Sequence, residues 1–85
     1  KNYMFRIKYA GIHNINQHYF ESNMQAGIDY DFLLFFHTPY CFGANKNETT
    51  EYSPNTIVYI PKFTPYYYSP VTKTVLYSFT KMIFL

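Results

Sequence analysis

Short runs of aromatic and β-branched residues, each closed by a turn residue, constrain the fold of this chain more than any other feature. The 85 residues include 11 Tyr and 9 Phe, and these aromatics make up 24% of the chain. Tyr, Phe, Ile, Val and Thr suit the pleated, half-buried surface of a β-sheet, and a disordered chain would be poor in them. No amphipathic helical pattern extends beyond about two turns. We therefore expect one all-β domain over residues 1–85.

The first half of the chain alternates strand patterns with polar breaks. Residues 3–9 place Tyr, Phe and Ile on one face, which predicts a half-buried strand that ends at Ala10 and Gly11. Residues 15–20 are mixed and could form a short strand, whereas residues 21–27 are polar and predict a loop. Residues 30–37 form the strongest apolar segment, with two apolar faces that predict a central strand covered on both sides.

The second half contains a predicted hairpin and further short strands. Residues 40–43 continue the pairing after Pro39, and residues 43–48 have the composition of a hairpin turn. The β-branched residues 56–60 predict a strand that ends at Pro61. We further expect a short extended piece over residues 66–68 and a long final strand over residues 74–85. Several short strands separated by turns predict a sandwich or a barrel.

Charge and cysteine content narrow the setting of the domain. The net charge is +2 and charged residues are 14% of the chain, which is low for a soluble domain. So few charges among so many tyrosines predict that a partner covers part of the surface. A single cysteine, Cys41, forms no internal disulfide and favours a reducing, cytoplasmic location. The longest apolar run, residues 32–36, is too short to cross a bilayer, and we expect no membrane association.

Residues 54–68 carry a family resemblance, and they read PNTIVYIPKFTPYYY. This segment resembles the strand-turn-strand of the cupin-like sensor domain in AraC-type transcription regulators. Asn55 stands where the family usually has glycine, and Asn is the next-best residue at a left-handed turn position. Phe63 stands where the family has a second glycine. Residues 31–39 and 77–85 are similar to two further strands of these sensors. The matching positions of the first segment are Pro54, Val58, Ile60, Pro61, Thr64, Pro65 and Tyr68.

The resemblance implies both a fold and a role. The fold would be a cupin-like barrel (a double-stranded β-helix or jelly roll), partial in this chain and completed by dimerisation. Such a sensor binds a small effector, often a sugar, inside the barrel and pairs with a second copy. It reaches DNA only through a helix-turn-helix region on its C-terminal side, which these 85 residues do not include. Effector binding would bias how that region is presented.

Four aromatic residues are the predicted ligand-binding set. By the resemblance, Tyr68 faces the pocket and Tyr66 lies near its mouth. Tyr59 lies on the same strand-turn-strand, and Phe36 belongs to the strongest apolar segment. A tyrosine offers a ring face for the C–H side of a sugar and a hydroxyl for hydrogen bonding. Packing of the barrel or of a dimer seam is the alternative role. The arginine with which the family often grips its effector has no counterpart in residues 23–27.

Metal and catalytic chemistry are not expected. His13, His18 and His37 lack the His-x-His spacing of metal cupins, and Tyr66 stands where those proteins place a later histidine ligand. Cys41 has no basic partner in the sequence, and neither a nucleophile elbow nor a phosphate loop is present. We therefore expect a binding domain with no cofactor, no metal and no catalytic residue.

Two alternatives remain open. One is a small stand-alone cupin enzyme, either a sugar isomerase or a metal-dependent oxygenase. The other is an aromatic-rich module for single-stranded nucleic acid, which normally requires a basic groove.

Overall fold

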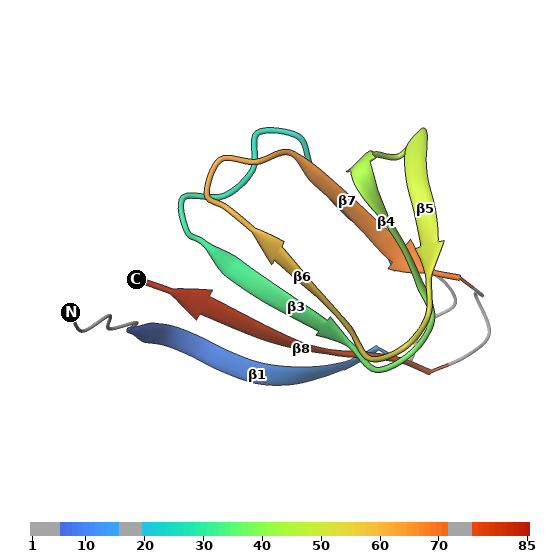
Figure 1. Ribbon diagram of the computed structural model, residues 1–85, viewed down its shortest axis with the longest axis horizontal. Coiled ribbons are helices and arrows are strands. Elements are labelled where there is room, and N and C mark those ends of the chain that lie inside the picture. The colour runs from blue at the N-terminus through green and yellow to red at the C-terminus, as the bar shows by residue number, and fades with distance from the viewer. Residues whose placement is uncertain (1–5, 16–19, 72–75) are drawn as a thin grey trace.

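The computed structural model describes residues 6–15, 20–71 and 76–85, and the regular structure within these ranges is entirely β (Figure 1). No helix in this part of the chain is long and apolar enough to span a membrane. The described residues form eight strands: β1 (Ile7–Ile15), β2 (Ser22–Met24), β3 (Phe32–Phe36), β4 (Tyr40–Asn45), β5 (Glu48–Tyr52), β6 (Thr56–Ile60), β7 (Tyr66–Pro70) and β8 (Tyr77–Phe84).

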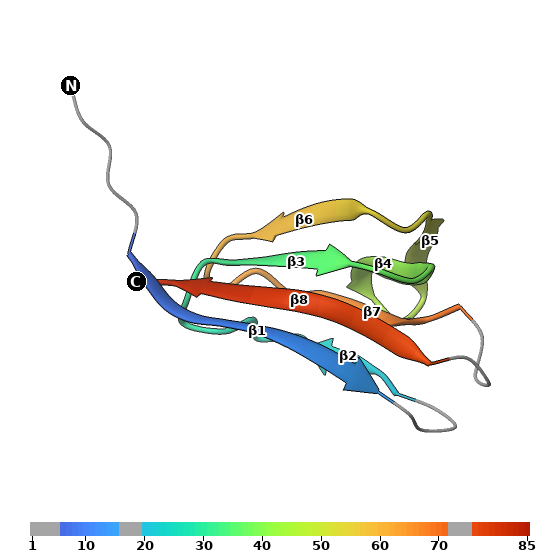
Figure 2. The ribbon, with the colours of Figure 1, turned by 90° about the horizontal axis from the view of Figure 1, so that it is seen from below.

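The strands form two antiparallel four-stranded sheets that face each other. One sheet has the order β1-β8-β3-β6 and the other has the order β2-β7-β4-β5. Consecutive strands belong to different sheets throughout, except β4 and β5, which are neighbours in one sheet. Figure 1 shows the sheets diverging from the end at which β3 leads into β4 and β5 into β6. In Figure 2, β1 and β2 follow one long side of the molecule and β5 and β6 the other. The predicted all-β, cupin-like partial barrel is confirmed.

Aromatic rings fill the space between the sheets. The core-facing side chains of β3 are Phe32, Leu34 and Phe36, and each is 0% exposed. Phe36 stacks on Tyr40 with ring centroids 3.6 Å apart and an interplanar angle of 12°. Offset and edge-to-face ring pairs stabilise a core beyond the apolar area they bury. The buried core cluster consists of Phe32, Leu34, Phe36, Tyr40, Ile60, Tyr66, Tyr68, Tyr77 and Phe79.

Strand β3 is central, as predicted, but the described residues cover only one of its faces. Its burial alternates, since Leu33 and Phe35 are half-buried between fully buried neighbours. On the adjacent strand β6, Ile57 is 60% exposed and Tyr59 is 57% exposed. The expectation of a strand covered on both sides is therefore wrong. An apolar outer face cannot be told from a buried one by sequence alone, because the same side chains suit both.

The two N-terminal strands also differ from the sequence expectations. Strand β1 does not end at Ala10 and Gly11 but passes through both, since it pairs with β8 as far as Ile15. The segment expected to be a loop contains β2, whose Ser22–Met24 pairs with Tyr66–Tyr68 of β7. Backbone pairing to β7 forms this strand, so its polar side chains can face solvent at the sheet edge. Residues 3–5 and 74–75 of the predicted first and last strands, and residues 16–19 of the predicted short strand, lie outside the described residues.

The predicted hairpin and the predicted β6 strand are confirmed. Strands β4 and β5 pair antiparallel, and the turn between them is shorter than expected because pairing continues to Asn45 and Glu48. The β6 strand has the predicted bounds, Thr56–Ile60.

Both turns of the strand-turn-strand segment have left-handed backbone conformations. Asn55 has φ of 67° and Phe63 has φ of 61°. The expected left-handed position at Asn55 is confirmed, and its N–H donates to the Phe36 carbonyl at 2.8 Å. Phe63 keeps the conformation of a glycine, which costs an L-residue about 1–2 kcal/mol. Gly27 (φ 68°) packs so closely on the Phe63 backbone that a side chain would not fit there.

Candidate functional site

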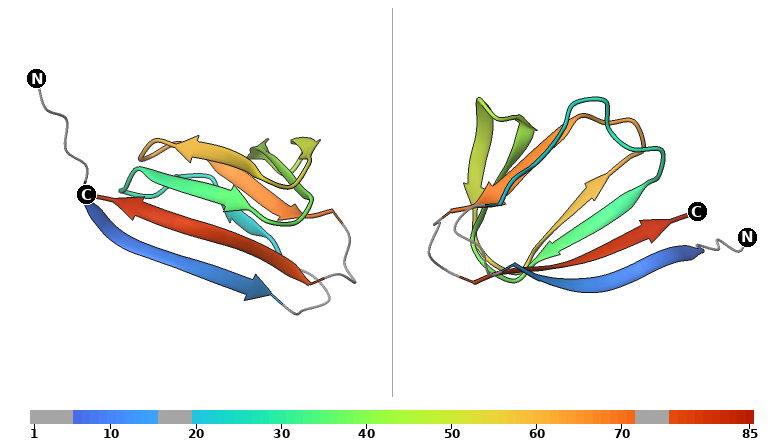
Figure 3. Two further views of the ribbon diagram at one scale, coloured as in Figure 1. Left: turned by 60° about the horizontal axis from the view of Figure 1, so that its bottom comes forward. Right: turned by 180° about the vertical axis from the view of Figure 1, so that it is seen from behind.

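The two sheets leave a cavity of about 350 Å³ between their edges at β5 and β6. Figure 3 shows β6 at the edge of one sheet and the β4–β5 hairpin at the edge of the other. We call this space the β5–β6 cavity. Its volume falls at the lower end of the range for small-molecule sites, ~300–1,000 Å³. The cavity is lined by Phe42, Gly43, Ala44, Glu48, Thr50, Tyr52, Tyr59, Ile60, Thr64, Pro65 and Tyr66.

The wall formed by the β4–β5 hairpin depends on Gly43. A Cβ at this position would overlap the backbone carbonyl of Glu48, which lies across the hairpin. The pairing register also shifts between Gly43 and Asn45. This close approach places Glu48 and Thr50 beside the cavity. Glu48 is the single charged residue among the described residues of the lining, so this wall of the cavity is acidic.

Tyr66 forms a rigid part of the cavity lining. The residue is 3% exposed, and its ring lies parallel to that of Tyr68 at 5.8 Å and edge-on to Phe32 at 5.2 Å. Burial raises the pKa of Tyr66, and a hydrogen bond with the Ser22 side chain opposes that shift. The phenol is therefore neutral at ordinary pH and can donate or accept a hydrogen bond.

Tyr59 lies at the rim of the cavity. It is 57% exposed, and it also borders a second hollow on the outer face of the β1-containing sheet, where Leu33 and Phe84 lie. Tyr52, on the opposite side of the opening, is 39% exposed and stacks on buried Tyr40 at 5.4 Å. The opening thus has a tyrosine on each side.

The structure brings two of the four predicted ligand-binding residues, Tyr59 and Tyr66, to the β5–β6 cavity. Tyr66 also belongs to the core cluster, together with Phe36 and Tyr68. Phe36 is 0% exposed, and Tyr66 and Tyr68 are each 3% exposed. Burial raises the pKa of Tyr68 to about 12.

The sequence does not predict the residues that the β4–β5 hairpin contributes to the cavity. Phe42, Glu48 and Thr50 come from β4 and β5, and their place at the cavity follows from the cross-strand register of the two strands. The sequence predicted the hairpin but contains no signal for which of its faces turns toward β6.

The two described histidines contact different neighbours. His13 stacks on Phe79 at 4.9 Å and hydrogen-bonds to the Tyr9 hydroxyl at 2.9 Å, while His37 hydrogen-bonds to Thr80 at 2.7 Å. His18 falls outside the described ranges. Burial is the main cause that raises the pKa of the Cys41 thiol, and Glu51 raises it further. Within residues 6–15, 20–71 and 76–85, no three His, Cys, Asp or Glu side chains gather as metal ligands would.

Comparison with known proteins bears on the fold alone. No family model and no curated protein matches the sequence. Among solved structures, the chain is similar to a putative ethanolamine utilization protein Q (EutQ) from Salmonella typhimurium LT2, with a TM-score of 0.59 and 16% identity. It is also similar to the EutQ protein of Clostridium difficile, with a TM-score of 0.56 and 10% identity.

The chain spans only part of both EutQ structures. The first match covers 87% of this chain and 55% of the Salmonella protein, and the second covers 94% of this chain and 65% of the Clostridium protein. Both are cupin-fold proteins. The class is thereby defined: the described residues form a cupin-type β domain with two antiparallel sheets.

Proposed function

We propose that this chain is the ligand-sensing and dimerisation half of an AraC-type transcription regulator, and that it binds a small, uncharged, hydroxylated molecule such as a sugar in the β5–β6 cavity. The observation that carries the proposal is the composition of that cavity. Its lining residues include the aromatic Phe42, Tyr59 and Tyr66, the acidic Glu48, and Thr50 and Thr64, which carry hydroxyl groups.

This combination matches the chemistry of a sugar. The C–H face of a pyranose packs on an aromatic ring, while its hydroxyls need hydrogen-bond partners once they leave water. An ionised Glu48 accepts hydrogen bonds only, so it pairs with ligand hydroxyls and repels anions. Within the described part of the chain, the lining residues include no Lys, Arg or His, and a phosphate or carboxylate ligand would therefore meet no positive charge from them. These two facts favour a neutral ligand over an anionic one.

The location of the cavity between the two sheets explains how a bound ligand would regulate the domain. The walls come from the edge strands of two different sheets, β5 and β6, so a ligand that contacts both favours one spacing of the sheets. A ligand with different affinities for two spacings shifts their populations. Exposed strand edges tend to pair with another chain. A second copy paired at such an edge would transmit the change in sheet spacing.

Calorimetric titration of the purified chain with a panel of neutral monosaccharides and their phosphate esters tests the ligand class. We expect at least one neutral sugar to bind and its phosphate ester to bind more weakly. Glu48→Gln should weaken the binding about tenfold, as expected when a charged hydrogen bond is lost. Glu51→Gln is the matched control, because Glu51 is on the same strand but pairs across from Cys41 and does not line this cavity. Tighter binding of the phosphate ester would contradict the proposal.

Two further measurements test the regulator itself. Reading the gene beyond codon 85 should reveal a helix-turn-helix region within the next ~150 codons, about one further domain. A gene that lacks such a region would contradict the regulatory role and leave the sugar site standing. Sedimentation equilibrium should give a dimer, and a stable monomer at high concentration would contradict pairing with a second copy.

A further inference from the structure

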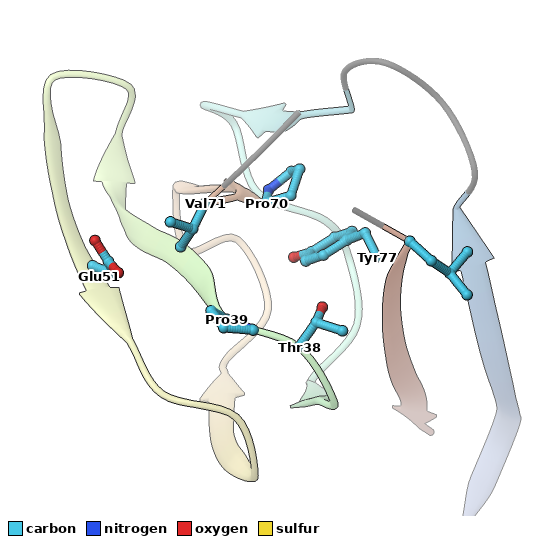
Figure 4. A pocket seen from close by; sticks show the side chains of 7 residues that line it. Thr38, Pro39, Glu51, Pro70, Val71 and Tyr77 are labelled. Atoms are coloured by element: carbon cyan, nitrogen blue, oxygen red, sulfur yellow. The ribbon is translucent and has the colours of Figure 1, made fainter. Parts of the chain in front are cut away.

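A second cavity, of about 300 Å³, lies at a different place in the sandwich from the β5–β6 cavity, and the two have no described lining residue in common. It is bounded by the β3–β4 connection, the end of β7 and the start of β8 (Figure 4). The greater part of its wall is apolar and comes from Pro39, Pro70, Val71 and Leu76. An apolar wall of this kind favours a ligand with a compact hydrocarbon body.

The Tyr77 hydroxyl is the polar group that this cavity leaves unexplained. Tyr77 is 2% exposed, and its hydroxyl has no hydrogen-bond partner among the described residues. Figure 4 shows its ring extending from β8 with the hydroxyl end toward the gap between Pro39 and Val71. Neighbouring atoms cover the oxygen itself. A buried hydroxyl without a partner costs about 1–3 kcal/mol. A ligand reaches this covered oxygen only by moving a side chain of the cavity wall aside, and a hydrogen bond to it would recover part of that cost.

The charge state of Tyr77 fixes which partner it needs. Burial is the largest cause that raises the pKa of Tyr77, and the nearby Tyr68, Tyr40 and Cys41 raise it further. The phenol therefore stays protonated and can donate its hydrogen to an acceptor on a ligand.

The other polar side chains of the cavity argue against an anion. Thr38 already accepts a hydrogen bond from the Ser78 N–H at 3.3 Å. Glu51, at the far side of the opening in Figure 4, places a carboxylate on the cavity wall. Among the residues that the structure describes, the lining contains no Lys, Arg or His to balance a negative ligand.

We propose that this cavity is a second small-molecule site, which takes a neutral compound with a compact apolar body and one carbonyl or ether oxygen that accepts a hydrogen bond from Tyr77. The proposal is independent of the sugar site, because it rests on different residues.

Two probes of nearly the same shape test this hydrogen bond. Cyclohexanone carries the acceptor oxygen, and methylenecyclohexane replaces that oxygen with a CH₂ group. Titrations of the ¹⁵N-labelled chain, followed by amide chemical shifts, should place both probes near Thr38, Val71 and Leu76. Cyclohexanone should bind about fivefold tighter, the ratio that one hydrogen bond of about 1 kcal/mol gives.

Tyr77→Phe is the decisive variant. It keeps the ring and removes an unpaired hydroxyl, so the fold should be retained, and the preference for cyclohexanone should disappear. Tyr40→Phe is the matched control. The Tyr40 hydroxyl is also buried without a hydrogen bond of normal geometry. The Thr56 side chain lies near enough to lower the pKa of Tyr40. Tyr40 is not among the residues that line the cavity. Equal affinities for the two probes in the unmodified chain, a preference that survives Tyr77→Phe, or shifts confined to the β5–β6 cavity would each overturn the proposal.

Discussion

The interior of the sandwich and the β5–β6 cavity contain the same residue types in two roles, which are core packing and candidate ligand binding. In the interior, Phe36 and Tyr68 are surrounded by other rings and almost fully buried. At the cavity, Tyr59 and Tyr66 lie beside a carboxylate and threonine hydroxyls. Tyr66 and Tyr68 even stack on each other from the same face of β7. Tyr66 is as buried as Tyr68 and belongs to the same core cluster, so its place beside the cavity, rather than its residue type or burial, makes it a candidate ligand-binding residue.

The largest expected difference between the two regions is in stability. Phe36→Ala should lower the free energy of unfolding by about 3–5 kcal/mol, since it empties a fully buried aromatic position. Tyr59→Ala, at an exposed rim position, should change it by less than about 1 kcal/mol. Urea denaturation of both variants measures the difference. Equal losses would contradict the assignment of Phe36 to the core and of Tyr59 to the rim.

The second-largest expected effect is a loss of stability at alkaline pH, which comes from the buried tyrosines of the interior. The pKa of Tyr68 is about 12 in the folded chain against 10.0 without burial, so unfolded chains lose this proton first. The contribution of Tyr68 to the free energy of unfolding is therefore constant below pH 10. Between pH 10 and 12 this contribution falls by about 2–3 kcal/mol. Tyr77 acts in the same direction. Burial lowers the pKa of Lys81, which instead favours folding as the pH rises through its folded-state pKa.

Tyr68→Phe isolates the tyrosine contribution to this pH dependence. Urea denaturation at several pH values between 8 and 11.5 should show a shallower decline for the variant than for the unmodified chain. Identical declines would mean that Tyr68 is not buried as described.

A substitution at the cavity should change the affinity for the ligand rather than the stability of the fold. Tyr59→Ala should weaken sugar binding about fivefold, as expected from losing one ring that stacks on the ligand, at about 0.5–1.5 kcal/mol. The melting temperature without ligand should stay nearly unchanged. Titration calorimetry and a thermal scan of the same variant separate the two effects. A lower melting temperature with unchanged affinity would assign Tyr59 a structural role.

The smallest expected effect concerns the turn that leads into the cavity wall. Phe63 has a left-handed backbone, is 61% exposed, and directly precedes the lining residues Thr64, Pro65 and Tyr66. Phe63→Asn should raise the free energy of unfolding by up to about 1 kcal/mol, because Asn tolerates this conformation better. Urea denaturation measures the change, and a loss of stability would show that the Phe63 side chain makes a contact worth more than the strain.

The sequence predicts elements whose signals are local and misses those made by pairing. Strand β6 was predictable because β-branched residues stand between the turn at Asn55 and Pro61. Strand β2 was not, since two polar residues and a methionine become a strand only by pairing with β7. The site divides in the same way. Tyr59 and Tyr66 follow from a recognisable segment, whereas Glu48 reaches the cavity through the register of the β4–β5 hairpin and the close approach at Gly43.

The central claim is that ligand binds between β5 and β6 and leaves the aromatic interior unchanged. Titrating the ¹⁵N-labelled chain with the neutral sugar that binds most tightly tests it most directly, with amide chemical shifts as the readout. The shifts should concentrate at Gly43, Glu48, Thr50 and Thr64, with little change at Phe36. Shifts centred on Phe36 and Tyr68, or a spectrum that no neutral sugar alters, would contradict the claim.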